Sequence, residues 1–186
     1  MEDVGPDRLG ELSRDLHELY RRCFAEPPWS ESKFDQYPER LAGQLTKPGV
    51  SGVIAQNGKA LAGVVYGWPA PDPLPADDPF YVTLPAAIHH LLRGPALEVV
   101  ELMVHPDHRG RGIGAALLDR FVSGHRTAWL CTHPQAPATR LYERAGWVAR
   151  GTFTFKGQPR VVYVWDTAAP STGSTARTAV PEPSLR

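Results

Sequence analysis

Glycine and arginine alternate in one short segment, Arg109-Gly-Arg-Gly-Ile-Gly114, which follows an apolar run and precedes a helical pattern. Glycine lets backbone N–H groups approach a ligand closely, and the start of a helix carries the positive end of its dipole. The two arginines add fixed positive charge. The segment therefore predicts a cradle for an anion, and it suits a phosphate or a pyrophosphate best.

Two common nucleotide motifs do not fit this segment. A P-loop requires Lys followed by Ser or Thr after its last glycine, and no Lys follows these glycines. A dinucleotide fingerprint requires G-x-G-x-x-G, whereas Gly110, Gly112 and Gly114 give G-x-G-x-G. Neither nucleotide motif is present in this segment.

The cradle lies between elements that would hold it in place. Residues 97–104 are an apolar run that predicts a strand, and residues 112–122 have the apolar spacing of a helix. A further strand is expected over 127–131. A helix is expected over 138–145, where Gly146 ends it.

The flanking sequence alternates helices and strands. Apolar spacing predicts helices over 7–24 and 33–45, and strands over 50–56 and 60–68 joined by Asn57-Gly58. Two closing strands are expected over 147–155 and 160–165. This order of elements predicts one α/β (α+β) sheet domain.

Two segments differ from the rest in composition. Residues 69–95 contain seven prolines and a net charge of −2, with one short helix expected over 86–92. Fifteen of the twenty residues in 167–186 are Ala, Ser, Thr, Pro or Gly, so we expect a disordered tail. The predicted organisation is a domain over 1–166 that contains the 69–95 insert, followed by the tail.

Composition excludes several classes of protein. The formal net charge is zero, so we expect no nucleic-acid partner. Two cysteines cannot form a disulfide scaffold or a four-cysteine zinc site, and no metal-binding motif occurs. With no secretory signal and no membrane-spanning run, we expect a cytoplasmic protein. The excess of arginine over lysine is typical of a GC-rich coding sequence, and we expect a bacterial protein.

Two blocks of the sequence resemble one family. Arg109-Gly-Arg-Gly112-Ile-Gly114 is similar to the R/Q-x-x-G-x-G/A signature of the GCN5-related N-acetyltransferases (GNAT). Ala138-Thr-Arg-Leu141-Tyr142-Glu143-Arg-Ala-Gly146-Trp147 resembles that family's A-x-x-L-Y-E-x-x-G-F block, and the resemblance covers roughly 7–166. It implies a single domain with a central mixed, mostly antiparallel twisted sheet flanked by helices.

The resemblance also implies a binding mode for acetyl-coenzyme A. The backbone from Arg109 through Gly110, Arg111, Gly112 and Ile113 to Gly114 would hold the pyrophosphate. The backbone near Met103 and Val104, on a central strand that splays from its neighbour, would hold the pantetheine. Gln135 is a further candidate for a coenzyme contact, at a position where many members carry Asn.

Three residues are candidates for the chemistry that the resemblance implies. An amine must lose its proton before it attacks, and Glu101 lies where some members carry the base. Alternation along the strand would place Glu98 on the opposite face. Tyr142 would lie near the thioester sulfur and could donate a proton to the leaving thiolate.

The acceptor is implied only as a class. The expected reaction is direct transfer of an acetyl group from acetyl-coenzyme A to a primary amine of a small molecule or peptide. Trp29 and Tyr81 could line the acceptor site, and the acidic insert could cover it or be a solvated loop. A non-catalytic acyl-coenzyme A sensor on the same fold stays open, and so does a homodimer.

Overall fold

A seven-stranded sheet runs through the residues that the computed structural model describes, which are 1–25, 27–29 and 33–168. Its strand order is β1-β2-β3-β4-β5-β7-β6, and every neighbouring pair is antiparallel except β4 and β5. The expected mixed, mostly antiparallel sheet is therefore confirmed. The strands are β1 (Glu2–Val4), β2 (Ser51–Asn57), β3 (Ala60–Pro69), β4 (Leu97–Val104), β5 (Thr127–Thr132), β6 (Val148–Phe155) and β7 (Gln158–Asp166).

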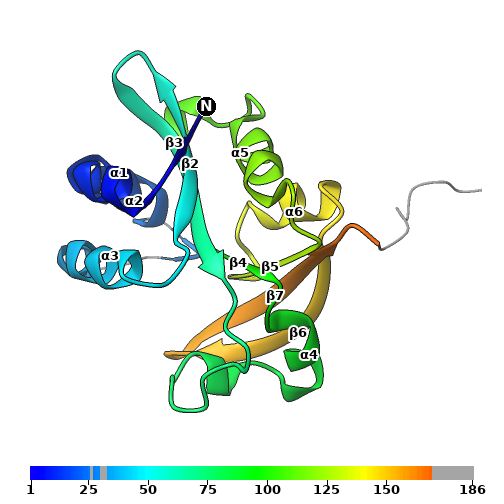
Figure 1. Ribbon diagram of the computed structural model, residues 1–186. Helices are drawn as coiled ribbons and strands as arrows, with labels where there is room; N and C mark the ends of the chain where they lie inside the picture. The colour runs from blue at the N-terminus through cyan, green and yellow to red at the C-terminus, as the bar shows by residue number, and fades with distance from the viewer. Residues whose placement is uncertain (26, 30–32, 169–186) are drawn as a thin grey trace, which may run out of the picture.

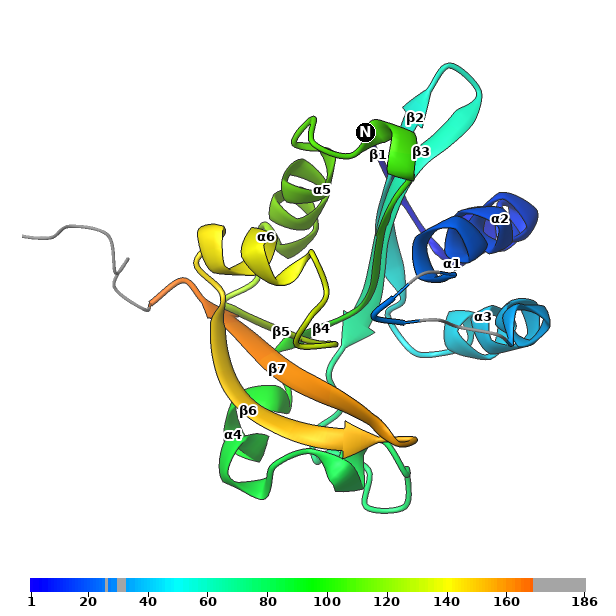
Figure 2. The ribbon, with the colours of Figure 1, turned by 180° about the vertical axis from the view of Figure 1, so that it is seen from behind.

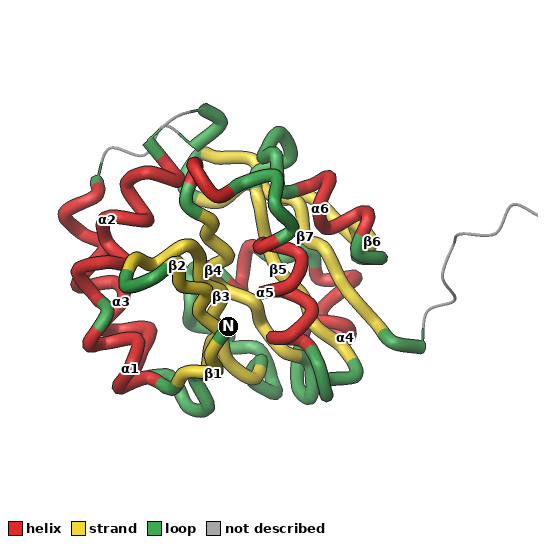
Figure 3. Tube along the Cα trace, turned by 90° about the horizontal axis from the view of Figure 1, so that it is seen from above, coloured by secondary structure: helices red, strands yellow, loops and turns green. Residues whose placement is uncertain are grey.

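Helices cover both faces of this sheet (Figures 1 and 3). On one face, α1 (Pro6–Glu11), α2 (Ser13–Phe24) and α3 (Tyr37–Leu45) pack over β2, β3 and β4. On the other face lie α5 (Ile113–Val122) and α6 (Thr139–Arg144). Figure 2 shows β6 and β7 curving away from β2 and β3, so the two halves of the sheet diverge.

The first helix is divided where the sequence predicts one continuous helix. Leu12 separates α1 from α2, with φ −87° and ψ 6°. The Leu12 amide still donates to Arg8, and its carbonyl accepts from the Leu16 amide. Hydrogen bonding continues across the break, so the buried leucines stay on one side, as their spacing predicts.

Strand β1 is not among the expected elements. It has three residues, too few to show an alternating pattern, and it pairs with β2 through Glu2 opposite Ile54. Its stability comes from that pairing and from Val4 in the core.

An irregularity in the pairing of β3 with β4 changes which side chains share a face. The register shifts between Tyr66 and Gly67, so Tyr66 lies opposite Glu101 and Trp68 lies opposite Glu98. Tyr66 and Trp68 are two residues apart and share a face of β3. The expectation that Glu98 and Glu101 point to opposite faces is therefore wrong, because one extra residue in β4 resets the alternation.

Strands β4 and β5 pair over only a short distance. Their parallel register runs from Leu97 opposite Ala128 to Val99 opposite Leu130. Beyond Val99 the two strands diverge, which agrees with the expected splay of the central strand. This divergence opens the sheet near its middle.

The proline-rich insert is packed against the sheet. It contains the 3-10 turns η2 (Tyr81–Thr83) and η3 (Ala86–Ile88) and the short helix α4 (His89–Leu92). Its buried side chains form a cluster with Trp129 of β5 and with Val162 and Val164 of β7. The insert thus covers the same face of β5 and β7 that α1–α3 cover on β2–β4.

The remainder of the predicted tail, 169–186, lies outside the described residues. Within the part of the chain that the structure describes, no helix is both long and apolar enough to cross a membrane.

Candidate active site

The divergence of β4 from β5 opens into a cleft of about 920 Å³. Its walls come from β4, the turn before α5, α6, and the end of α2 with the segment 27–29. A cavity of this size holds a ligand of several hundred daltons. The cleft brings together Glu101, Val104, Arg109, Gly110, Gly112, Ile113, Gly114, Tyr142 and Trp29.

The glycine turn at the mouth of the cleft has the geometry of an anion cradle. Gly110 and Gly112 have φ of 75° and 77°, a conformation that side chains with a Cβ rarely adopt. Gly112 precedes α5, and its amide and those of Ile113 and Gly114 donate no backbone hydrogen bond within the described chain. These amides and the start of a ten-residue helix are free to bind an anion.

Gly114 has a separate structural role. A Cβ at this position would lie 3.0 Å from Cδ1 of Leu141 and 3.4 Å from Cγ2 of Val104. The absence of a side chain lets α5 approach both α6 and β4.

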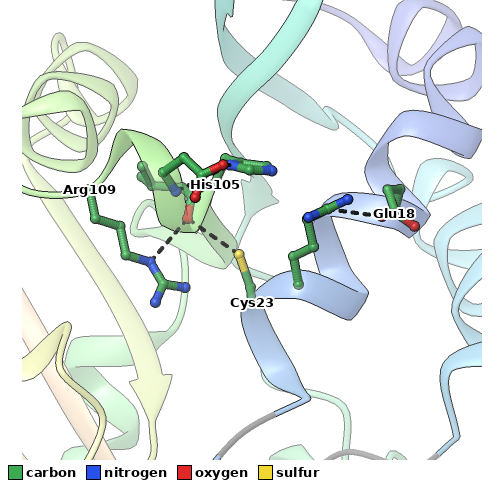
Figure 4. A network of polar contacts seen from close by, with 7 residues as sticks. Glu18, Cys23, His105 and Arg109 are labelled. Carbon is green, nitrogen blue, oxygen red and sulfur yellow. Dashed lines mark hydrogen bonds and ion pairs between the residues drawn. The ribbon is translucent and has the colours of Figure 1, made fainter.

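Two side chains from distant parts of the chain contact the backbone carbonyl of Val104. Nε of Arg109 donates to it at 3.2 Å, and the thiol of Cys23 in α2 lies 3.4 Å away (Figure 4). Burial raises the pKa of the Cys23 thiol, so it stays protonated and can donate. Val104 lines the cleft, whereas the side chain of Met103 is buried in the core beneath the N-terminal helices.

Glu101 lies at the inner part of the cleft with a side chain that is 15% exposed. Burial raises the pKa of this carboxyl group to about 7, against the opposing effect of Arg40. Nη2 of Arg40 lies 3.5 Å from Oε1 of Glu101. A carboxyl group that titrates near neutral pH suits a general base.

Arg40 is held by two aromatic rings. Its guanidinium lies 4.7 Å from the ring centre of Tyr20 and 5.1 Å from that of Tyr37. Arg40 was not among the predicted site residues, because it is one of many arginines in the chain and its partner is 61 residues away. No local pattern could have found it.

Tyr142 reaches the cleft from α6 and is buried. Burial and then the nearby Glu101 carboxylate raise the pKa of this phenol well above its usual range. The phenol therefore stays protonated at neutral pH and is available as a hydrogen-bond donor. The structure brings the two predicted catalytic side chains into electrostatic contact.

Glu98 lies outside the cleft lining, in a buried cluster beneath the insert. Its Oε2 accepts hydrogen bonds from the Tyr81 hydroxyl at 2.6 Å and from Nε1 of Trp68 at 3.1 Å. Burial raises the pKa of Glu98 to about 7. Tyr81 is thus a buried partner of Glu98, and the structure does not bring it to the cleft.

Trp29 does line the cleft, in contact with two residues that sequence analysis did not select for the site. Its ring centre lies 5.7 Å from that of His133 and 5.1 Å from the guanidinium of Arg160. His133 follows β5 and Arg160 belongs to β7. These three come together only through the tertiary fold.

The side chains of two further residues predicted to contact the coenzyme are not part of the cleft lining. Gln135 is exposed, and its backbone amide donates to Nδ1 of His133 at 3.1 Å. Arg111 is also exposed and is not part of the cleft lining. No group of three or more potential metal ligands occurs among the described residues.

One family model matches the sequence. Residues 13–147 match the model described as "Acetyltransferase (GNAT) family". The match spans α2 to the end of α6, and so includes the cradle, Glu101 and Tyr142. No curated protein is similar enough to match the chain.

Solved structures share the fold at low sequence identity. An aminoglycoside 6'-acetyltransferase type Ii is 18% identical, with a TM-score of 0.60 over 89% of this chain and 97% of that one. An acetyltransferase from Thermus thermophilus is 17% identical, with a TM-score of 0.59 over 88% and 93%. The PaiA N-acetyltransferase from Thermoplasma acidophilum, in complex with coenzyme A, is 15% identical, with a TM-score of 0.56 over 87% and 98%.

Proposed function

The chain belongs to the GNAT acetyltransferase family and is an acyltransferase of that type, and we propose that it transfers an acetyl group from acetyl-coenzyme A to a primary amine. The acceptor is a small molecule or a peptide, and transfer is direct within a ternary complex. The observation that carries this proposal is the cleft itself. One opening in the sheet joins an anion cradle to a carboxyl group and a phenol.

The cradle fits the pyrophosphate of coenzyme A. The amides of Gly112, Ile113 and Gly114 and the start of α5 supply donors and positive potential where the cleft reaches the surface. Arg109 adds a guanidinium that is anchored to the Val104 carbonyl. The pantetheine arm would run from this cradle along β4, where Val104 lines the cleft.

Glu101 acts as the base in this proposal. It takes a proton from the ammonium group of the acceptor, directly or through water, and the neutral nitrogen then attacks the thioester carbonyl carbon. Its pKa of about 7 leaves a large fraction ionised at neutral pH and makes proton uptake less unfavourable than at an ordinary carboxylate. Arg40 would favour the ionised form and fix the orientation of the carboxylate.

Tyr142 assists the leaving group. As the new C–N bond forms, the nitrogen releases its second proton through water to solvent. As the C–S bond breaks, the phenol donates a hydrogen bond or its proton to the thiolate sulfur. Its raised pKa favours the hydrogen bond, because complete proton transfer would leave a buried phenolate. Proton return from solvent would complete the cycle if the phenol transfers its own proton.

Thiol release in the presence of acetyl-coenzyme A tests the proposal. The purified chain is mixed with amines from four classes, namely polyamines, aminoglycosides, amino acids and short peptides, and the products are identified by mass spectrometry. N-acetylated product with stoichiometric thiol supports the proposal. Coenzyme binding without acetylated product from any class would instead favour the sensor that the sequence left open.

Three further expectations accompany the proposal. We expect a cytoplasmic enzyme that uses no metal ion and binds no nucleic acid. A homodimer is compatible with it, and sedimentation of the purified chain would decide. None of these affects the assignment of roles within the cleft.

A further inference from the structure

Arg160 belongs to β7, in the second half of the sheet, and lies behind a residue of the cleft wall without being part of the lining itself. In the pairing of β5 with β7, Val161 lies opposite Thr132, so Arg160 comes one position beyond the last paired residue of β5. Thr132 and Trp29 both line the cleft. The guanidinium of Arg160 is 5.1 Å from the ring centre of Trp29, so it is one side chain away from the cleft.

The charge of Arg160 is not balanced by a carboxylate in the described part of the chain. The side chain is partly buried, and its hydrogen bond goes to the carbonyl of the preceding Pro159 at 3.0 Å. Arg40, by contrast, has Oε1 of Glu101 at 3.5 Å. Removing a guanidinium from water without an anionic partner is unfavourable, and a bound anion would offset that cost.

His133 contributes polarity at this site without negative charge. Its Nδ1 accepts from the Gln135 amide, so a neutral ring carries its proton on Nε2. Burial and then Arg160 lower the pKa of His133, which keeps the ring neutral at physiological pH. A guanidinium beside a neutral imidazole and an indole favours an anionic ligand group and repels a cationic one.

We propose that Arg160, set against Trp29 and His133, binds a carboxylate of the acceptor, so that the acceptor is an amine that also carries a carboxyl group. This rests on the proposed acetyl transfer and names its substrate class. Glu101 on β4 receives the amine and Arg160 on β7 receives the carboxylate. A single guanidinium fork fits a planar carboxylate, whereas the multiple amides of the cradle fit a phosphate.

The proposal distinguishes between the acceptor classes of the activity screen. Polyamines and aminoglycosides have several ammonium groups and no carboxylate, so Arg160 would disfavour them. Amino acids and peptides with a free C-terminus have both groups. The length between amine and carboxylate is set by the span from β4 to β7, and graded ω-amino acids would measure it.

Matched acids and amides test the subsite. The wild-type enzyme is assayed with ω-amino acids and dipeptides and with the corresponding carboxamides, which differ only in the charge at one end. We expect kcat/KM to be about 10–100-fold higher for the acids, mainly through KM. Equal values for acids and amides, or a preference for polyamines, would overturn the proposal.

Substitutions locate the effect. In Arg160→Gln the acid-over-amide ratio should fall to about one while kcat at saturation changes little, and Arg160→Lys should restore part of the ratio. Arg150→Gln, at an exposed position on β6, is the matched control and should retain the full ratio. If Arg160→Gln retained the acid-over-amide ratio, a group other than Arg160 would bind the carboxylate and the proposal would be wrong.

A binding measurement separates this proposal from the proposed function. With coenzyme A present, ligand-observed NMR compares binding of the same acids and amides to wild type and Arg160→Gln. If no amine is acetylated, the proposed function fails, yet selective binding of acids that Arg160→Gln abolishes would still support the subsite. Absence of selective binding to wild type would reject the subsite by itself.

Discussion

Glu101 owes its titration range to two opposing effects, burial between α3 and β4 and a guanidinium at 3.5 Å. Burial disfavours the carboxylate, and Arg40 favours it. The balance leaves a pKa of about 7, where a carboxyl group can exchange a proton with an amine under physiological conditions. The same balance would be disturbed by any change at Arg40.

Removing the charge of Arg40 should move the pH profile. In Arg40→Gln the pKa of Glu101 should rise further, so the carboxyl group stays protonated at pH 7 and cannot accept a proton. We expect the acid limb of kcat/KM to shift to higher pH and activity at pH 7 to fall, with recovery as the pH rises. Arg40→Lys keeps the charge and should shift the limb less. An acid limb that does not move would argue against Glu101 as the base.

Tyr142 can be tested by removing one oxygen atom. Tyr142→Phe should lower kcat by about 100-fold, the lower range for a lost general acid, with little change in the affinity for coenzyme A. Tyr163→Phe is the matched control, because its hydroxyl donates to Glu143 at 3.1 Å and does not line the cleft. Similar kcat in both variants would exclude Tyr142 as the donor.

At the scale of elements, the irregular pairing of β3 with β4 directs Glu101 toward α3. Gly67 permits it, since a Cβ there would overlap the carbonyl oxygen of Glu98. The extra residue in β4 also turns Glu98 toward the insert. One glycine on β3 therefore governs the direction of two carboxyl groups on β4.

Alanine at Gly67 should disturb both strands. We expect Gly67→Ala to lower the free energy of unfolding by about 1–3 kcal/mol and to reduce activity, because β4 must shift to accommodate the methyl group. Gly43→Ala is the control, since a Cβ in that turn of α3 meets nothing within 4 Å and alanine favours helix. Urea unfolding of both variants measures the difference. Unchanged stability in Gly67→Ala would mean that the pairing tolerates a side chain.

The packing of the insert should depend on pH through Glu98. Its pKa in the folded chain is about 7, above the ordinary 4.5, so its contribution to stability is full below pH 4.5 and is lost as the pH rises through 7. Glu98→Gln cannot ionise and can still accept from Tyr81 and Trp68. We expect its stability to fall less than that of wild type between pH 5 and 8 in urea unfolding. Parallel pH dependences would contradict the raised pKa.

At the scale of the whole molecule, the cleft lies between two halves of one sheet, each with its own hydrophobic cluster. A ligand in the cleft contacts α2, β4, α5 and α6 together, so its binding should stabilise the complete fold. Because the amides of the cradle and Arg109 can form charge-assisted hydrogen bonds, most of the affinity for coenzyme A should come from its phosphates.

Thermal unfolding with coenzyme A and with pantetheine measures how much of the affinity comes from the phosphates. At 100 times its dissociation constant, coenzyme A should add about 2.7 kcal/mol to the free energy of unfolding. Pantetheine at the same concentration should stabilise far less, because it lacks the pyrophosphate. Equal stabilisation by the two compounds would show that the cradle does not contribute to coenzyme A binding.

The sequence by itself determined the elements and the motifs whose partners are near in the chain. The glycine–arginine turn, the start of α5, the apolar strand β4 and the block around Tyr142 all follow from local spacing, since backbone conformation and helix periodicity are set by neighbouring residues. The resemblance of two such blocks to one family led to the correct fold and enzyme class.

Only the tertiary structure decided which charged and aromatic side chains lie next to one another around the cleft. Arg40 pairs with Glu101, 61 residues away in the chain. The Tyr81 hydroxyl donates to Glu98, and Tyr81 does not line the cleft. The guanidinium of Arg160 packs on the ring of Trp29. Glu98 shares a face of β4 with Glu101 because the register between β3 and β4 shifts by one residue, which alternation within β4 alone does not show. Electrostatic interactions act through space over a few ångströms, so packing between distant segments, and not their sequence spacing, determines them.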